Sequence, residues 1–180
     1  MITVFVEGPS DELFIESLFP DIEKNVVQYS NKKNDKINKH IQTLDKMNEK
    51  YFFLFDTDTK NPNVKLQEKI NQIKSLNKYN CFPVIIEIES WFRAGCSDNL
   101  CRKYKIKSIT NTEWYSKEKM QSEFKTEHLT NIFQEILNDF SLNSAQQLNK
   151  SFKLFFLSFN QWKFNSNPPS TYIDFGVRIG

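Results

Sequence analysis

Short apolar runs and longer amphipathic stretches alternate through the first half of the chain. Four runs are rich in β-branched and aromatic residues and have the length of strands; they occupy residues 2–6, 25–29, 51–55 and 81–88. Between them, apolar side chains recur at the spacing of one helix face, as in Ile37, Ile41, Leu44 and Met47. The run YFFLF has no polar position, which is typical of a strand buried on both faces. This alternation predicts an α/β fold, in which helices sandwich a parallel sheet of about four strands.

Turn and capping residues mark the ends of these elements. The first run ends at Glu7, and Ser10 stands where the N-cap of the next helix is expected. Pro20 ends that helix, because proline cannot continue it. A further helix is predicted over residues 64–78.

From residue 90 onward the apolar spacing is mostly helical. Helices are predicted over residues 91–104, 116–124, 129–140 and 144 to about 162. The run LFFLSF has strand propensity, but Leu148, Phe152 and Phe159 keep helical spacing, which favours a buried helix. The tail, 168–180, is predicted to be irregular or an edge strand. We therefore expect an α/β core over residues 1–92 and a helical extension over 93–180, packed as one compact unit.

Composition narrows the class of protein without naming a partner. The 180 residues carry 24 basic and 22 acidic side chains, a net charge of +2 that is too weak by itself to indicate a nucleic-acid binder. Residues 1–91 carry −2 and residues 92–180 carry +4. No apolar run is long enough to span a membrane, and the first residues lack the pattern of a signal peptide, so we expect a cytoplasmic protein. Three cysteines without a CxxC pair predict neither a disulfide framework nor a zinc site.

Acidic side chains follow three of the four predicted strands. They are Glu7 with Asp11 after the first run, Asp56 with Asp58 after the third, and Glu87 with Glu89 at the end of the fourth. The carboxyl ends of parallel strands meet at one edge of a sheet, where open α/β sheets bind ligands, so these acids are expected to converge. Asp56 and Asp58 would point the same way in a locally extended segment. Such a cluster suits Mg²⁺ or Mn²⁺, because carboxylate oxygens bind hard cations and a cation relieves their mutual repulsion.

Each acid also has an ordinary interpretation. Asp11 lies in the first turn of a helix, where an acid interacts favourably with the helix dipole. The sequence Asp-x-Asp is common in turns, and Glu87 and Glu89 could be solvated. The repeated position of the acids at successive strand ends favours a shared site over these separate roles.

The three acidic segments together resemble a known domain. The segments VFVEGPSDELFIESLF, FLFDTDTK and VIIEIESWF resemble the TOPRIM domain, in particular the modules of OLD-type nucleases and of small stand-alone phage-defence proteins. The resemblance covers roughly residues 1–92. It implies that Glu7 is the first-strand glutamate and that Asp56 and Asp58 are paired metal ligands. Asp11 would serve a second metal, and Glu89, or alternatively Glu87, would be a further ligand. Lys60 would be a basic residue beside the acids.

The resemblance also implies a function. It predicts a Mg²⁺- or Mn²⁺-dependent nuclease in which Glu7, Asp11, Asp56 and Asp58 are catalytic and Lys60 assists electrostatically. DNA is favoured over RNA as the substrate, and an ATPase on another chain is a possible partner in anti-phage defence. No tyrosine is placed as a topoisomerase nucleophile, and a primase would need a zinc-binding cluster. A structured-RNA maturation nuclease and a non-catalytic partner or sensor subunit remain the alternatives.

Overall fold

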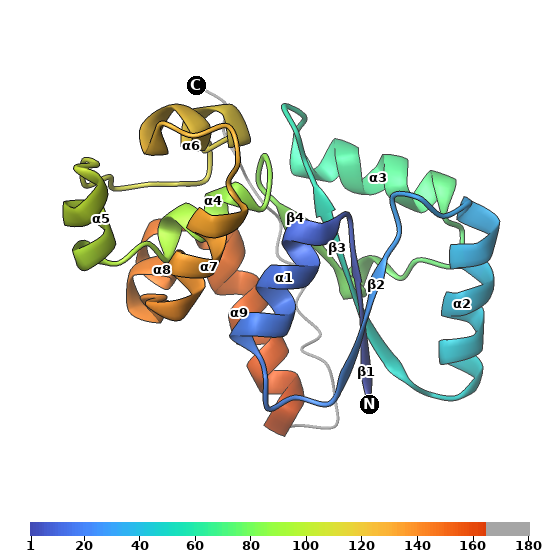
Figure 1. Cartoon of the computed structure of the whole chain (residues 1–180). Coiled ribbons are helices and arrows are strands. Elements are labelled where there is room, and N and C mark those ends of the chain that lie inside the picture. The colour runs from blue at the N-terminus through green and yellow to red at the C-terminus, as the bar shows by residue number, and fades with distance from the viewer. Residues whose placement is uncertain (165–180) are drawn as a thin grey trace. The chain divides into compact units, whose positions relative to one another are not determined.

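The computed structural model describes residues 1–164, which belong to two compact units (Figure 1). The first unit, residues 1–83, contains β1 (Ile2–Val6), α1 (Pro9–Leu18), β2 (Lys24–Gln28), α2 (Asn34–Lys46), β3 (Lys50–Asp56), α3 (Pro62–Gln72), the short 3₁₀ helix η1 (Lys78–Asn80) and most of β4 (Cys81–Val84). The second unit begins at Val84 and contains α4 (Glu89–Ala94), α5 (Asp98–Tyr104), α6 (Lys117–Phe124), α7 (Thr130–Asn138), α8 (Leu142–Leu148) and α9 (Lys150–Phe164). The boundary expected after residue 92 falls inside α4.

The four strands form a parallel sheet in the order β2-β1-β3-β4, which confirms the predicted α/β fold. In the register of the central strands, Ile2 lies opposite Lys24 of β2 and Lys50 of β3. Figure 1 shows α1 on one side of the sheet and α2 with α3 on the other. The chain leaves β1 toward β2 but leaves β3 toward β4. The carboxyl ends of the adjacent strands β1 and β3 therefore form the switch point at which open α/β sheets bind ligands.

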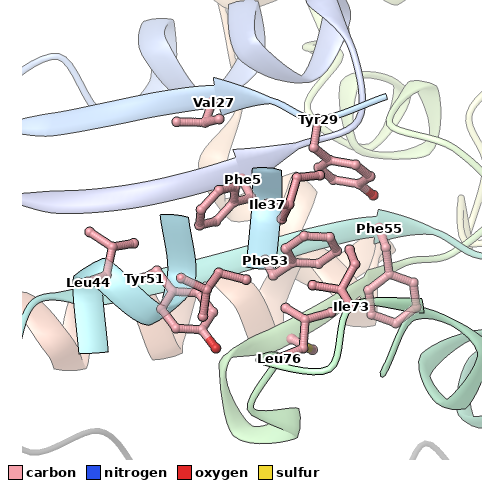
Figure 2. Close-up of a cluster of buried hydrophobic side chains, with 12 residues drawn as sticks. Phe5, Val27, Tyr29, Ile37, Leu44, Tyr51, Phe53, Phe55, Ile73 and Leu76 are labelled. Atoms are coloured by element: carbon pink, nitrogen blue, oxygen red, sulfur yellow. The ribbon is translucent and has the colours of Figure 1, made fainter. Parts of the chain in front are cut away.

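Aromatic side chains from alternate strand positions fill the space between the sheet and α2 with α3 (Figure 2). The strands contribute Phe5, Val27, Tyr51, Phe53 and Phe55, and the covering segments contribute Ile37, Ile41, Leu44, Ile73 and Leu76. Tyr29 stacks on Phe53 with ring centroids 4.5 Å apart, so the aromatic ring of Tyr29 belongs to this core. The intervening positions of β1 and β3 are also buried, which confirms that YFFLF is covered on both faces.

In the second unit, the helices pack around the fully buried Trp91 of α4. Its indole Nε1 donates to Ser151 Oγ at 2.8 Å, and its ring stacks on Phe155 at 5.2 Å. The segment LFFLSF is helical, as the spacing predicted. However, the helix predicted over 144–162 is divided at Asn149, whose Oδ1 accepts from Phe152 N at 2.8 Å and so caps a new helix.

Two other predicted boundaries were wrong. Ser10 is inside α1 rather than its N-cap; Gly8 is the cap, because the proline after it suits the first helical position and the Asp11 carboxylate accepts the Gly8 N–H. β4 ends at Val84 instead of residue 88, and Ile86 beyond it has a left-handed φ of 61°. The tail predicted over 168–180 lies outside the described residues. Within residues 1–164, every helix is too short or too polar to cross a membrane.

The helix predicted over 91–104 is also divided, because α4 ends at Gly95 and Ser97 caps α5 by accepting from Leu100 N. The chain at Gly95 passes close to Phe140, and a Cβ at this position would overlap the Phe140 ring. We expect Gly95→Ala to lower the free energy of unfolding by about 1–3 kcal/mol, as in other overpacked cores. Urea unfolding measures this loss. Adding Phe140→Leu should recover part of it, and an unchanged stability in Gly95→Ala would contradict the close approach.

Candidate active site

Two carboxylates end the central strands of the sheet. Glu7 directly follows β1, and Asp56 is the last residue of β3. The strands are adjacent and parallel, and the Asp56 N–H donates to Glu7 Oε2 at 3.3 Å. Two of the acids predicted for the site are therefore joined directly at the switch point.

Asp11 is a third carboxylate at this edge, and it is buried. The residue is only 4% exposed. Its Oδ2 accepts from Gly8 N at 3.1 Å, whereas its buried Oδ1 has no hydrogen-bond partner within residues 1–164. Burial raises the pKa of Asp11 from 3.8 to about 6, the N–H groups of Gly8 and of Asp11 itself lower it, and the charge of Glu7 adds to the rise. Asp11 is therefore held in a setting that disfavours its charged form unless a cation is near.

The hydroxyl of Tyr29 joins this group from the end of β2. It lies 3.0 Å from both Glu7 Oε2 and the Leu54 carbonyl oxygen. Lys69 of α3 approaches from the helical layer, with Nζ 3.4 Å from the Tyr29 hydroxyl and 3.7 Å from Glu7 Oε2. The Glu7 carboxylate is thus held by a phenol, a backbone N–H and an ammonium group.

The electrostatics of Tyr29 link all three acids. Burial raises its pKa well above 10, and the negative charges of Glu7, Asp56 and Asp11 raise it further. Sequence reasoning missed Tyr29 because it treated the residue as part of an apolar strand. A signal was present in the sequence: Tyr29 stands at the end of the second apolar run, as Glu7 stands at the end of the first. The β1–β2 register, which pairs Val6 with Gln28, brings these two positions to the same edge.

The loop after β3 is not extended. The expectation that Asp56 and Asp58 point the same way assumed an extended segment. It forms a turn in which Lys60 N donates to Thr57 O at 2.9 Å, and Asp58 has a left-handed φ of 52°. Asp58 is largely exposed and pairs with Lys65 of α3 at 2.5 Å. The assumption of an extended Asp-x-Asp was therefore wrong.

Lys60 forms an ion pair with Glu68 of α3. Its Nζ lies 2.7 Å from Glu68 Oε1, and both side chains are substantially exposed. Within residues 1–164, the ammonium groups beside the acids of β1 and β3 are those of Lys65, which pairs with Asp58, and Lys69, which lies beside Glu7. They are four residues apart on α3, a spacing that places them on one face and that the sequence analysis overlooked.

Glu87 and Glu89 belong to the second unit and are described within it. Glu87 Oε2 accepts from Lys117 N at 2.8 Å, at the first residue of α6. Glu89 is 6% exposed in the first turn of α4. Both residues follow the end of β4 by several positions, because that strand is shorter than predicted.

The donor set at the carboxyl ends of β1 and β3 suits a hard divalent cation. All the candidate ligands are carboxylate oxygens, and one buried oxygen of Asp11 lacks a hydrogen-bond partner. Within residues 1–164, no three His, Cys, Asp or Glu side chains already form a metal-binding cluster.

Comparison with protein-family models, with curated proteins and with solved structures finds no match to this chain.

Proposed function

We propose that the protein is a divalent-metal-dependent nuclease that cleaves phosphodiester bonds at the carboxyl ends of β1 and β3. The observation that carries the proposal is the contact of the Glu7 carboxylate with the Tyr29 hydroxyl and the Asp56 N–H at the switch point of a parallel sheet, where the charges of Asp56 and Asp11 also raise the pKa of Tyr29. The unpartnered buried oxygen of Asp11 supports it, because carboxyl groups in such settings are concentrated at functional sites.

In this proposal, Glu7, Asp11 and Asp56 hold Mg²⁺ or Mn²⁺, with Asp58 as an additional ligand once it leaves Lys65. The bound cation would supply Lewis-acid chemistry and a water of lowered pKa. Tyr29 and the Asp56 N–H fix the orientation of the Glu7 carboxylate.

The lysines of the site supply positive charge for a phosphate backbone. Lys69 lies beside Glu7, and Lys65 lies beside Asp58, so both ammonium groups border the acids. Lys60 stays in the proposal as an electrostatic assistant only if it leaves Glu68. Glu89, with Glu87 as the alternative, is proposed as a further ligand on the TOPRIM resemblance alone.

The substrate and partner proposals also follow from that resemblance. They are DNA in preference to RNA, and an ATPase on another chain in anti-phage defence. Maturation of structured RNA is the alternative within the same chemistry, so both polymers belong in the assay.

A second candidate is a non-catalytic subunit that uses this fold to bind a partner or a nucleic acid. The ion pairs favour it: Lys65 neutralises Asp58, and Lys69 partly neutralises Glu7, without any metal. In that case, the acids stabilise the packing of α3 against the sheet and bind no cation.

The test is cleavage of plasmid, single-stranded DNA and structured RNA with Mg²⁺ or Mn²⁺. We expect metal-dependent cleavage that Glu7→Gln and Asp56→Asn each reduce at least about 100-fold, because losing a ligand should cost at least as much as losing a group that orients one. Calorimetric titration with Mn²⁺ should show binding that both variants weaken. Asp35→Asn, an exposed acid in the first turn of α2, is the matched control and should retain both properties.

Each outcome distinguishes the candidates. Cleavage that survives chelation or both substitutions contradicts a metal mechanism. Absence of Mn²⁺ binding, together with no cleavage of any of the three substrates, supports the non-catalytic subunit.

A further inference from the structure

Two of the three cysteines lie in contact within the second unit. Cys96 follows the end of α4, and Cys101 lies on α5. Their sulfur atoms are 3.8 Å apart. A disulfide has a sulfur–sulfur distance of about 2.05 Å, so a movement of less than about 2 Å would join them.

The two thiols differ in exposure and in neighbours. Cys101 is partly exposed, and its Sγ lies 3.9 Å from Nη1 of Arg93. Cys96 is buried, with 6% exposure. Exposure therefore distinguishes Cys101 from Cys96, because a dissolved oxidant reacts first with an accessible thiol.

We propose that Cys96 and Cys101 form a redox-active dithiol, in which a hydroperoxide oxidises Cys101 and Cys96 then closes an intramolecular disulfide. This inference goes beyond the proposed nuclease function and does not depend on it. The accessible thiol beside Arg93 is the one that a solvent-borne oxidant meets first. The buried thiol is the resolving partner.

The chemistry balances in two steps. The Cys101 thiolate attacks one peroxide oxygen; the S–O bond forms, the O–O bond breaks, and the departing oxygen leaves as water after taking up a proton. Cys96 sulfur then attacks the Cys101 sulfenic acid; the S–S bond forms, and the hydroxyl leaves as water with the Cys96 proton. One hydrogen peroxide is thus reduced to two waters, and two thiols are oxidised to a disulfide.

Cys96 becomes a better partner once the first step has occurred. Burial chiefly raises its pKa to about 12, and the negative charge of Cys101 raises it further. A sulfenic acid at Cys101 is neutral, so the contribution from that charge disappears. Burial still disfavours the thiolate of Cys96. The short distance between the two sulfur atoms compensates, because the attack takes place within one molecule.

Cys81 provides an internal control, because it is also a buried cysteine but belongs to β4. Its Sγ contacts the Asn77 carbonyl oxygen at 3.3 Å. Burial raises its pKa to about 12. A thiol in this setting should resist the oxidant that reaches Cys101.

The test treats the full-length protein with hydrogen peroxide and digests it with trypsin after blocking free thiols. Cleavage after Arg93 and Arg102 releases peptide 94–102, AGCSDNLCR, which contains both cysteines. We expect this peptide unblocked and about 2 Da lighter than its reduced form, with reversal by dithiothreitol and with Cys81 still blocked. Retention of all three blocked thiols, or oxidation of Cys81 at the same rate, would overturn the proposal.

Variants assign the two roles. Cys96→Ser should trap Cys101 as a sulfenic acid that dimedone labels, whereas Cys101→Ser should leave Cys96 unlabelled. Cys81→Ser should form the disulfide as the unaltered protein does. Dimedone labelling of Cys96 in Cys101→Ser would contradict the assignment of Cys101 as the reactive thiol.

Discussion

We expect Glu123→Ala to lower the free energy of unfolding of the second unit by about 3–5 kcal/mol, because it removes one partner of a buried ion pair. Glu123 Oε2 lies 2.7 Å from Nε of Arg93, whose side chain is only 2% exposed. The Tyr115 hydroxyl donates to the same carboxylate, and Arg93 Nη2 donates to the Lys107 carbonyl at 2.7 Å. Alanine removes the carboxylate that neutralises the buried guanidinium and leaves the Tyr115 hydroxyl without its acceptor.

Tryptophan fluorescence during urea unfolding measures this effect selectively, because Trp91, Trp114 and Trp162 all belong to the second unit. Glu118→Ala is the matched control: it removes an exposed glutamate from the same helix, α6, and should cost less than about 1 kcal/mol. A loss in Glu123→Ala as small as that of the control would contradict a buried pair.

Replacing both charges separates the loss of the pair from the cost of an orphaned charge. In Arg93→Met combined with Glu123→Leu, no buried charge remains, so we expect a smaller loss than in Glu123→Ala alone. A double variant that is less stable than Glu123→Ala would show that packing or the Lys107 hydrogen bond dominates. The same unfolding measurement decides between these outcomes.

The sequence predicted the fold where hydrophobic periodicity alone determines it. The unbroken run at 51–55 predicted a central buried strand, and β3 is that strand. The breaks within helices were harder to predict because they depend on distant contacts. Asn149 caps α9 through its Oδ1, while its Nδ2 donates to Thr112 and Ser90, which lie far away in the sequence. Gly95 is required by the approach of Phe140.

The candidate site was predictable in part for the same reason. Glu7 and Asp56 follow strands that the pattern located correctly, and the structure joins them. Lys69 could not be placed, because its approach to Glu7 depends on how α3 packs against the sheet. The orientation of Asp58 depended on the dihedral angles of a turn, which an Asp-x-Asp pattern does not determine.

We expect Asp11→Asn to raise the free energy of unfolding at pH 7 by up to about 3 kcal/mol. The pKa of Asp11 is raised to about 6 from 3.8, chiefly by burial, and a shift of about two pKa units corresponds to about 3 kcal/mol. The residue is 4% exposed, so solvent screening offers little relief. Asparagine keeps an oxygen to accept the Gly8 N–H but carries no charge to bury. Asp35→Asn is the control. Asp35 lies in the first turn of α2, as Asp11 lies in the first turn of α1, but it is exposed, so its replacement should lower the free energy of unfolding by at most about 1 kcal/mol.

The pH dependence of the Asp11 effect provides the stricter measurement. Because the folded state binds the Asp11 proton more tightly than the unfolded state does, this group stabilises the fold fully below about pH 3.8, and the contribution is lost as pH rises through about 6. Urea unfolding followed by circular dichroism should therefore give a difference between Asp11→Asn and the unaltered protein that grows from pH 4 to pH 7. A difference that is constant with pH would contradict the raised pKa.

If Asp11 binds a cation, saturating Mn²⁺ at pH 7 should stabilise the unaltered protein more than Asp11→Asn, because the cation neutralises the charge that burial penalises. Equal stabilisation of both proteins would remove Asp11 from the proposed ligands while leaving its pKa effect intact.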